Sequence, residues 1–100
     1  MIRYSMTMNW IKISWIHEFE TEPVLMYIEL NNIGLETRKV EIYKDDSSGF
    51  ASADNNFGGT SLSSMPIPES DLTKIDPQFI VKFITKNEFN SIWKERTELT

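Results

Sequence analysis

Hydrophobic and polar residues alternate along much of the first half of the chain. In residues 10–17, Ile11, Ile13 and Trp15 occupy every second position and share one predicted face. A period of two that is rich in Trp and Ile is typical of a β-strand. Three further stretches in this part of the chain are predicted to be strands: residues 24–30, 36–44 and 50–54.

Short polar segments connect these predicted strands. Asn31, Asn32 and Gly34 supply turn residues, and residues 45–49 are predicted to form a hairpin loop with Gly49 in a left-handed conformation. Three tight connections in succession indicate an antiparallel meander. The following region is less regular: residues 55–64 are predicted to be a loop, 69–75 one or two helical turns, and 79–84 a final edge strand.

The C-terminal region has a clear helical pattern. Thr85 and Glu88 have the spacing of a capping box, in which each side chain satisfies a backbone amide at the start of a helix. An amphipathic helix must bury its apolar stripe, and the predicted sheet offers the surface for it. The stripe follows the cap at helical spacing and ends in a long aliphatic stem: Phe89, Ile92, Trp93 and Arg96.

These elements predict an α+β fold, in which an antiparallel β-meander of about four to five strands packs against a C-terminal α-helix. The 100 residues are expected to form a single domain, with residues 1–9 as a frayed extension. The chain lacks the run of ~20 apolar residues that a transmembrane helix needs, and its N-terminus lacks the features of a secretory signal. We therefore expect a cytoplasmic protein that does not bind membranes.

Acidic residues give the chain a formal net charge of −5, and no Lys or Arg occurs between Lys12 and Arg38. A surface of this kind repels nucleic acid and attracts cationic proteins, although solubility alone is a second explanation of the charge. Neighbouring aromatic side chains are expected to anchor a protein partner. The residues predicted to form this binding face are Glu18, Glu20, Glu22, Tyr27, Tyr43, Asp45, Asp46, Asp54 and Phe57.

His17 is the main candidate for chemistry because it is the only histidine and lies beside several glutamates. A carboxylate that orients an imidazole can prepare it to act as a general base. The chain has no cysteine and no second histidine, and the spacing ties no nucleophile to His17. We expect a structural histidine, with no catalytic residue, metal or cofactor. The alternative is a small enzyme or ligand-binding protein that uses His17 and nearby carboxylates.

The chain resembles a family of short, uncharacterised bacterial proteins in two specific motifs. W-I-H-E-F-x-x-E-P-V-L occupies residues 15–25, and E-T-R-K-V-E-I-Y occupies residues 36–43. Looser matches extend the resemblance from Met8, which corresponds to the usual start of the family, to Trp93. Residues 46–48 depart from the basic residue and glycine that the family often has after its third strand.

Some members of that family lie beside toxin genes of contact-dependent inhibition or other polymorphic toxin systems and look like immunity proteins. The resemblance therefore implies a protein without enzymatic activity that binds and neutralises a cognate bacterial toxin domain. We expect a nuclease toxin, because nucleases are usually cationic where they hold phosphate, and an acidic partner mimics their substrate. A regulatory or scaffold module without a toxin partner is a third hypothesis, and the oligomeric state stays open.

Overall fold

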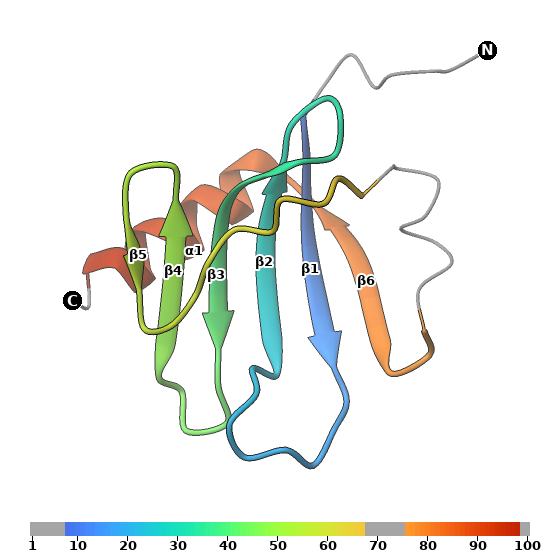
Figure 1. Ribbon diagram of the computed structural model, residues 1–100, viewed down its shortest axis with the longest axis vertical. Helices are drawn as coiled ribbons and strands as arrows, with labels where there is room; N and C mark the ends of the chain where they lie inside the picture. The colour runs from blue at the N-terminus through green and yellow to red at the C-terminus, as the bar shows by residue number, and fades with distance from the viewer. Residues whose placement is uncertain (1–7, 68–75, 99–100) are drawn as a thin grey trace.

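The structure, a computed structural model, describes residues 8–67 and 76–98 (Figure 1). One antiparallel sheet has the strand order β5-β4-β3-β2-β1-β6, so the first five strands form a meander and the last strand pairs beside the first. The helix α1 lies across one face of this sheet (Figure 1). The elements are β1 (Asn9–Trp15), β2 (Leu25–Leu30), β3 (Glu36–Ile42), β4 (Ser48–Ser52), β5 (Asn56–Phe57), β6 (Phe79–Ile84) and α1 (Lys86–Glu98).

This architecture confirms the predicted α+β class, the antiparallel meander and the C-terminal helix. The sheet has six strands rather than four or five, because the predicted loop over 55–64 contains the two-residue strand β5. β6 is confirmed as an edge strand. β1 begins at Asn9, which was predicted to belong to the frayed extension. The helical turns predicted for 69–75 lie outside the described residues.

The more apolar face of the sheet is the one that α1 does not cover. Ile11 pairs with Ile28 across β1 and β2, and both side chains are buried in a cluster with Ile13 and Leu30. Ile67 packs against this cluster from the segment that follows β5 and crosses the same face (Figure 1). The sheet is therefore buried on both faces, by a helix on one side and by an extended segment on the other.

Gly34 allows that crossing segment to approach the sheet. Ile67 donates its amide to the carbonyl oxygen of Gly34 at 2.8 Å. A Cβ atom at Gly34 would lie 2.7 Å from the carbonyl carbon of Ile67, and the positive φ of 85° also favours glycine. Both the close approach of Ile67 and the positive φ therefore favour glycine at this position of the turn between β2 and β3.

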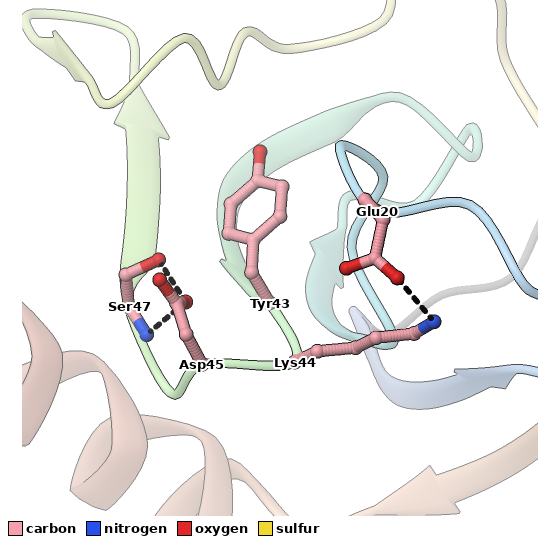
Figure 2. A pocket seen from close by; sticks show the side chains of 5 residues that line it. All are labelled: Glu20, Tyr43, Lys44, Asp45 and Ser47. Carbon is pink, nitrogen blue, oxygen red and sulfur yellow. Dashed lines mark hydrogen bonds and ion pairs between the residues drawn. The ribbon is translucent and has the colours of Figure 1, made fainter.

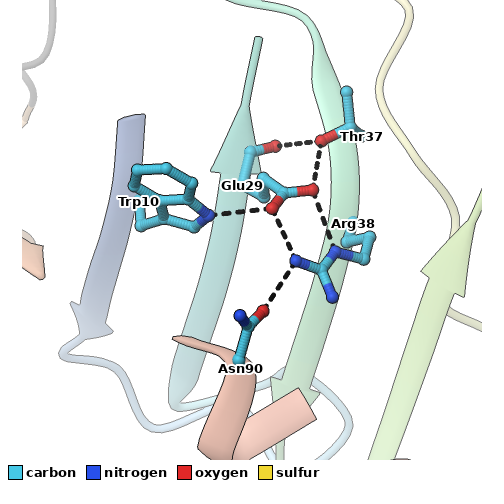
Figure 3. A network of polar contacts seen from close by, with 5 residues as sticks. All are labelled: Trp10, Glu29, Thr37, Arg38 and Asn90. Carbon is cyan, nitrogen blue, oxygen red and sulfur yellow. Dashed lines mark hydrogen bonds and ion pairs between the residues drawn. The ribbon is translucent and has the colours of Figure 1, made fainter. Parts of the chain in front are cut away.

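The helix-side face of the sheet contains a buried polar network as well as apolar contacts (Figure 3). Both carboxylate oxygens of Glu29 accept hydrogen bonds from Arg38, at 2.9 Å from Nε and at 2.6 Å from one terminal nitrogen. Trp10 donates its indole N–H to Glu29 at 2.8 Å, and the Thr37 hydroxyl donates at the same distance. Arg38 also donates to the side chain of Asn90, at 2.9 Å. The network therefore connects three strands to α1.

Apolar packing completes the attachment of the helix. Phe89 is fully buried, and the guanidinium carbon of Arg38 lies 4.8 Å from the centre of its ring. One half of the predicted capping box is present, since the Glu88 amide donates to the Thr85 hydroxyl at 3.1 Å. The Glu88 carboxylate accepts a hydrogen bond from that hydroxyl at 3.3 Å and not from the Thr85 backbone amide. These contacts fix where α1 begins and which of its faces meets the sheet.

The β3–β4 hairpin departs from the prediction at Gly49. The left-handed residue of this loop is Asp46, with φ of 69°, and not Gly49. Gly49 is instead required by close packing, because a Cβ atom there would clash with the Thr60 hydroxyl and lie 2.8 Å from the Phe57 carbonyl oxygen. Arg96 stabilises the strained residue, donating to the carbonyl oxygen of Asp46 at 2.9 Å and to its carboxylate at 3.0 Å.

The Glu29 network predicts a specific dependence of stability on pH. Burial by itself raises the pKa of Glu29, but hydrogen bonds from Arg38, Trp10 and Thr37 outweigh it and lower the pKa from 4.5 to about 2. A lowered pKa stabilises the fold above the unfolded-state value, and that stabilisation is lost as the pH falls from 4.5 towards about 2. The expected loss is about 3 kcal/mol. Urea unfolding at a series of pH values measures it.

The variant Glu29→Gln tests whether Glu29 is the group that causes this pH dependence. It leaves the Arg38 charge without a buried partner, and we expect it to lower the free energy of unfolding at pH 7 by about 3–5 kcal/mol. Its stability should also change less than that of the wild type between pH 4.5 and about 2, because the titrating group is gone. Equal pH slopes for the two proteins would contradict the assignment of this titration to Glu29.

Candidate functional site

Two acidic connections of the chain meet at one end of the sheet (Figure 1). One is the segment between β1 and β2, and the other is the hairpin between β3 and β4. Both lie at the same end because consecutive strands of a meander run in opposite directions. Four exposed carboxylates from these connections form what we call the acidic end: Glu18, Glu20, Glu22 and Asp45.

A shallow pocket of about 200 Å³ lies between the two connections (Figure 2). Glu20 lines it from the β1–β2 connection, and Tyr43, Asp45 and Ser47 line it from the hairpin. The fifth residue is Lys44, whose ammonium group lies 3.9 Å from the Glu20 carboxylate. Because the Glu20 side chain is 86% exposed, this ion pair contributes little to stability. Glu20 thus remains accessible to a partner.

The hairpin side of the pocket has a defined charge and geometry. Asp45 accepts hydrogen bonds from the Ser47 hydroxyl at 2.6 Å and from its amide at 3.0 Å, which lowers the pKa of Asp45 and keeps it ionised. Burial raises the pKa of Tyr43, and the negative charges of Glu41 and Glu22 raise it further. Tyr43 is therefore a neutral phenol beside a set of carboxylates.

The structure separates Tyr27, Asp54 and Phe57 from this end, whereas Asp46 is exposed in the same hairpin as Asp45 and pairs with Arg96. Tyr27 lies on the helix-side face under the Lys12 ammonium group, which is 5.7 Å from the centre of its ring. Asp54 follows β4 at the opposite end of the sheet, and Phe57 stacks on Phe50 of β4 at 5.5 Å. The predicted residues therefore do not form one continuous surface, because the two ends of β4 lie at opposite ends of the sheet. Which of them bind a partner stays a prediction.

His17 organises the β1–β2 connection. Its Nδ1 atom accepts a hydrogen bond from the Phe19 amide at 2.9 Å, and Nε2 lies 2.8 Å from the carbonyl oxygen of Pro23. Since Nδ1 is an acceptor, the proton must be on Nε2, which donates to Pro23. No glutamate of the described chain forms a hydrogen bond with this ring. Both ring nitrogens are occupied by the backbone, which leaves no free lone pair for a general base.

Aromatic side chains form a row beside the acidic end. Phe79 stacks on Trp15 at 5.3 Å between ring centres, Trp15 meets the edge of His17 at 4.3 Å, and His17 stacks on Phe19 at 5.4 Å. Phe19 is 59% exposed and the adjacent Ile16 is 62% exposed. The sequence analysis did not predict this row as a binding feature. The signal was the spacing of the aromatic residues 15, 17 and 19, because alternate side chains of an extended segment point to the same side.

The described residues contain no group of three His, Asp or Glu side chains arranged to hold a metal ion. In the same part of the chain, no helix is long and apolar enough to cross a membrane. What the site combines is exposed negative charge, an aromatic row whose Phe19 is exposed, and a shallow pocket with a single lysine. These are the components of a surface that binds a cationic partner, because each can make contacts without rearrangement of the core.

Comparison with known proteins identifies one family. The model of a family described as a domain of unknown function (DUF6881) matches residues 9–98. No curated protein and no solved structure matches the chain. The matched region includes every described strand and the helix, so it covers both the acidic end and the aromatic row.

The role of His17 predicts the effect of its substitution. His17→Ala removes both hydrogen bonds that close the β1–β2 connection, and we expect a loss of about 1–2 kcal/mol in the free energy of unfolding. His17→Asn keeps an acceptor near the Phe19 amide and should lose less. Amide hydrogen exchange of Phe19 should accelerate in the alanine variant more than in the asparagine variant. A ¹⁵N spectrum showing the proton on Nδ1 would contradict the geometry.

Proposed function

Because the chain belongs to the DUF6881 family, whose function is unknown, we propose its role from the surface that it displays: it is a binding protein whose acidic end engages a cationic partner protein. The observation that carries this proposal is the convergence of two acidic connections on one end of the sheet. Glu18, Glu20, Glu22 and Asp45 are all exposed there, and only Lys44 of the pocket offsets them.

Charge at this end supports fast and selective association. Like charges gathered on one exposed surface produce a field that attracts a cationic protein and raises its association rate. The acidic end is held by defined contacts, since His17 fixes the first connection and Asp45 fixes the second through Ser47. A partner therefore meets two connections whose backbone is held before binding, and this reduces the entropy lost on association.

The aromatic row supplies the apolar contacts that charge alone lacks. Phe19 and Ile16 are exposed next to Glu18 and Glu20, so carboxylates surround an apolar surface. An arginine side chain fits such a surface, because its guanidinium group can stack on an aromatic ring and pair with a carboxylate at once. We propose that these residues anchor the interface and that the carboxylates orient the partner.

The partner class that we propose is a toxin domain with a cationic active site, most simply a nuclease. A protein that presents carboxylates in place of phosphates can cover such a site and exclude the nucleic acid. In this role the chain is an immunity protein that acts in the cytoplasm of the cell that makes it. The support is the surface charge of the acidic end together with the family resemblance of the sequence.

Charge reversal tests this function. The triple variant Glu18→Lys, Glu20→Lys and Glu22→Lys should fold, because all three side chains are exposed. We expect its association rate constant with a cationic nuclease toxin domain that the wild type binds to fall by about 10- to 1000-fold at low salt. Stopped-flow fluorescence measures the rate, and survival of cells that produce the toxin measures protection.

The matched control is the triple variant Asp54→Lys, Glu95→Lys and Glu98→Lys, which makes the same change in net charge at exposed positions outside the two acidic connections. It should keep most of the association rate and the protection. Equal losses in the two variants would show that total charge, and not the acidic end, drives binding. No loss in either variant would refute the proposed interface.

A further inference from the structure

The outer edge of β6 is the longer of the two free edges of the sheet. Within residues 8–67 and 76–98, the six-residue strand β6 pairs with β1 alone, whereas the edge strand at the other side, β5, has two residues. Ile80 is 55% exposed on the helix-side face, and Phe83 is 48% exposed on the opposite face. Neither proline nor a bulge interrupts the strand. An apolar edge of this length is a template for pairing with a further strand.

The register of β6 shows which of its backbone groups point outwards. The amide of Ile16 donates to the carbonyl oxygen of Gln78, just beyond the Trp15–Phe79 pair. Because inward and outward positions alternate along an antiparallel strand, Ile80 and Lys82 direct their backbone groups towards β1. Phe79, Val81 and Phe83 direct theirs outwards. Consistent with this direction, the Phe79 amide donates to Asp76, outside the sheet, at 2.9 Å.

The outward groups of Val81 and Phe83 have no hydrogen-bond partner among the described residues. We propose that a second copy of this chain supplies the partner, and that two β6 strands pair antiparallel about a twofold axis through Val81. In this arrangement Val81 exchanges both backbone hydrogen bonds with its own copy, and the Phe83 amide donates to the carbonyl oxygen of Phe79 in the other copy. The two sheets become one continuous sheet.

Side-chain chemistry selects this register. Directly opposite residues share a face, so Phe79 of one copy meets Phe83 of the other, and Ile80 meets Lys82. Pairing Phe79 with Phe83 buries the exposed Phe83 ring in an aromatic contact across the strands. Ile80 packs on the aliphatic stem of Lys82, whose ammonium group stays in water. Each exposed apolar residue of the edge thereby gains a partner.

The symmetric register centred on Lys82 is unfavourable because it would place this lysine opposite its own copy. Lys82 already lies opposite Lys12 in the β1–β6 pair, and among the described residues no carboxylate forms an ion pair with either lysine. That register would therefore align the lysines of both copies in one row across the dimer, and like charges directly opposite destabilise a sheet. With the axis at Val81 the row is instead Lys12, Lys82, Ile80 and Ser14.

The dimer has a consequence for binding. A twofold axis perpendicular to the paired strands directs the ends of the two sheets in opposite directions. The acidic ends of the two copies therefore lie far apart and both stay accessible. The dimer would be bivalent, and its formation does not depend on the partner proposed for the acidic end.

Two measurements on the whole chain test the dimer. Sedimentation equilibrium of the wild type across a dilution series should show a reversible monomer–dimer equilibrium. Because the chain has no cysteine, single cysteine variants then report the register. Val81→Cys places the two thiols at the twofold axis and should form a disulfide-linked dimer at least about ten-fold faster than Lys82→Cys under mild oxidation, since disulfide formation requires close Cβ atoms.

Lys82→Cys is the matched control because it lies on the same strand and is the more exposed of the two positions. A monomer at every concentration would overturn the proposal and leave the edge to a strand from a different protein. A dimer in which Lys82→Cys links faster would overturn the register. A dimer in which neither variant links would overturn the pairing of Val81 with its own copy. Charge reversal at the acidic end should leave the equilibrium unchanged, so this test and that of the acidic end can fail separately.

Discussion

The buried ion pair between Glu29 and Arg38 is the interaction on which the rest of the structure depends. Glu29 is 6% exposed, and removing a carboxylate from water is costly unless its oxygens are hydrogen-bonded. Here Trp10, Thr37 and Arg38 supply those bonds, and Arg38 reaches Asn90 of the helix. The pair therefore requires three strands and α1 to be in place together, which makes it a constraint on the whole arrangement.

This constraint explains which face of the sheet the helix covers. A helix with an apolar stripe would be expected to pack on the most apolar surface, yet α1 lies over the face that carries Glu29 and Arg38. The rings of Phe89 and Trp93 lie 4.8 and 5.3 Å from the Arg38 guanidinium carbon, so the helix shields the charge and also makes cation–π contacts with it. The cluster around Ile11 and Ile28 is left to the segment that ends at Ile67.

A sheet covered on both faces leaves its ends and edges as the surfaces available for partners. The connections at one end gather the acidic residues. The outer edge of β6 carries exposed Ile80 and Phe83, and the outward backbone groups of Val81 and Phe83 have no partner in the described part of the chain. Both surfaces are polar or charged enough to remain hydrated in the isolated protein, but both contain apolar side chains that a partner would cover. The two surfaces share Phe79, which belongs both to the aromatic row and to β6.

Local pattern in the sequence determined the elements, because strand alternation, the capping box of α1 and the turn residues act over a few positions. The tertiary structure decided which residues from distant parts of the chain are neighbours in space. β5 has only two residues and no pattern of its own, and the tight packing at Gly49 depends on Thr60 from a distant part of the chain. Glu18, Glu20, Glu22 and Asp45 lie together because two neighbouring connections carry them. The structure places Asp54 and Phe57 elsewhere, because their position depends on strand direction. The Glu29–Arg38 pair, the Lys12–Lys82 juxtaposition and the free edge of β6 are likewise properties of strand order, which no short-range pattern encodes.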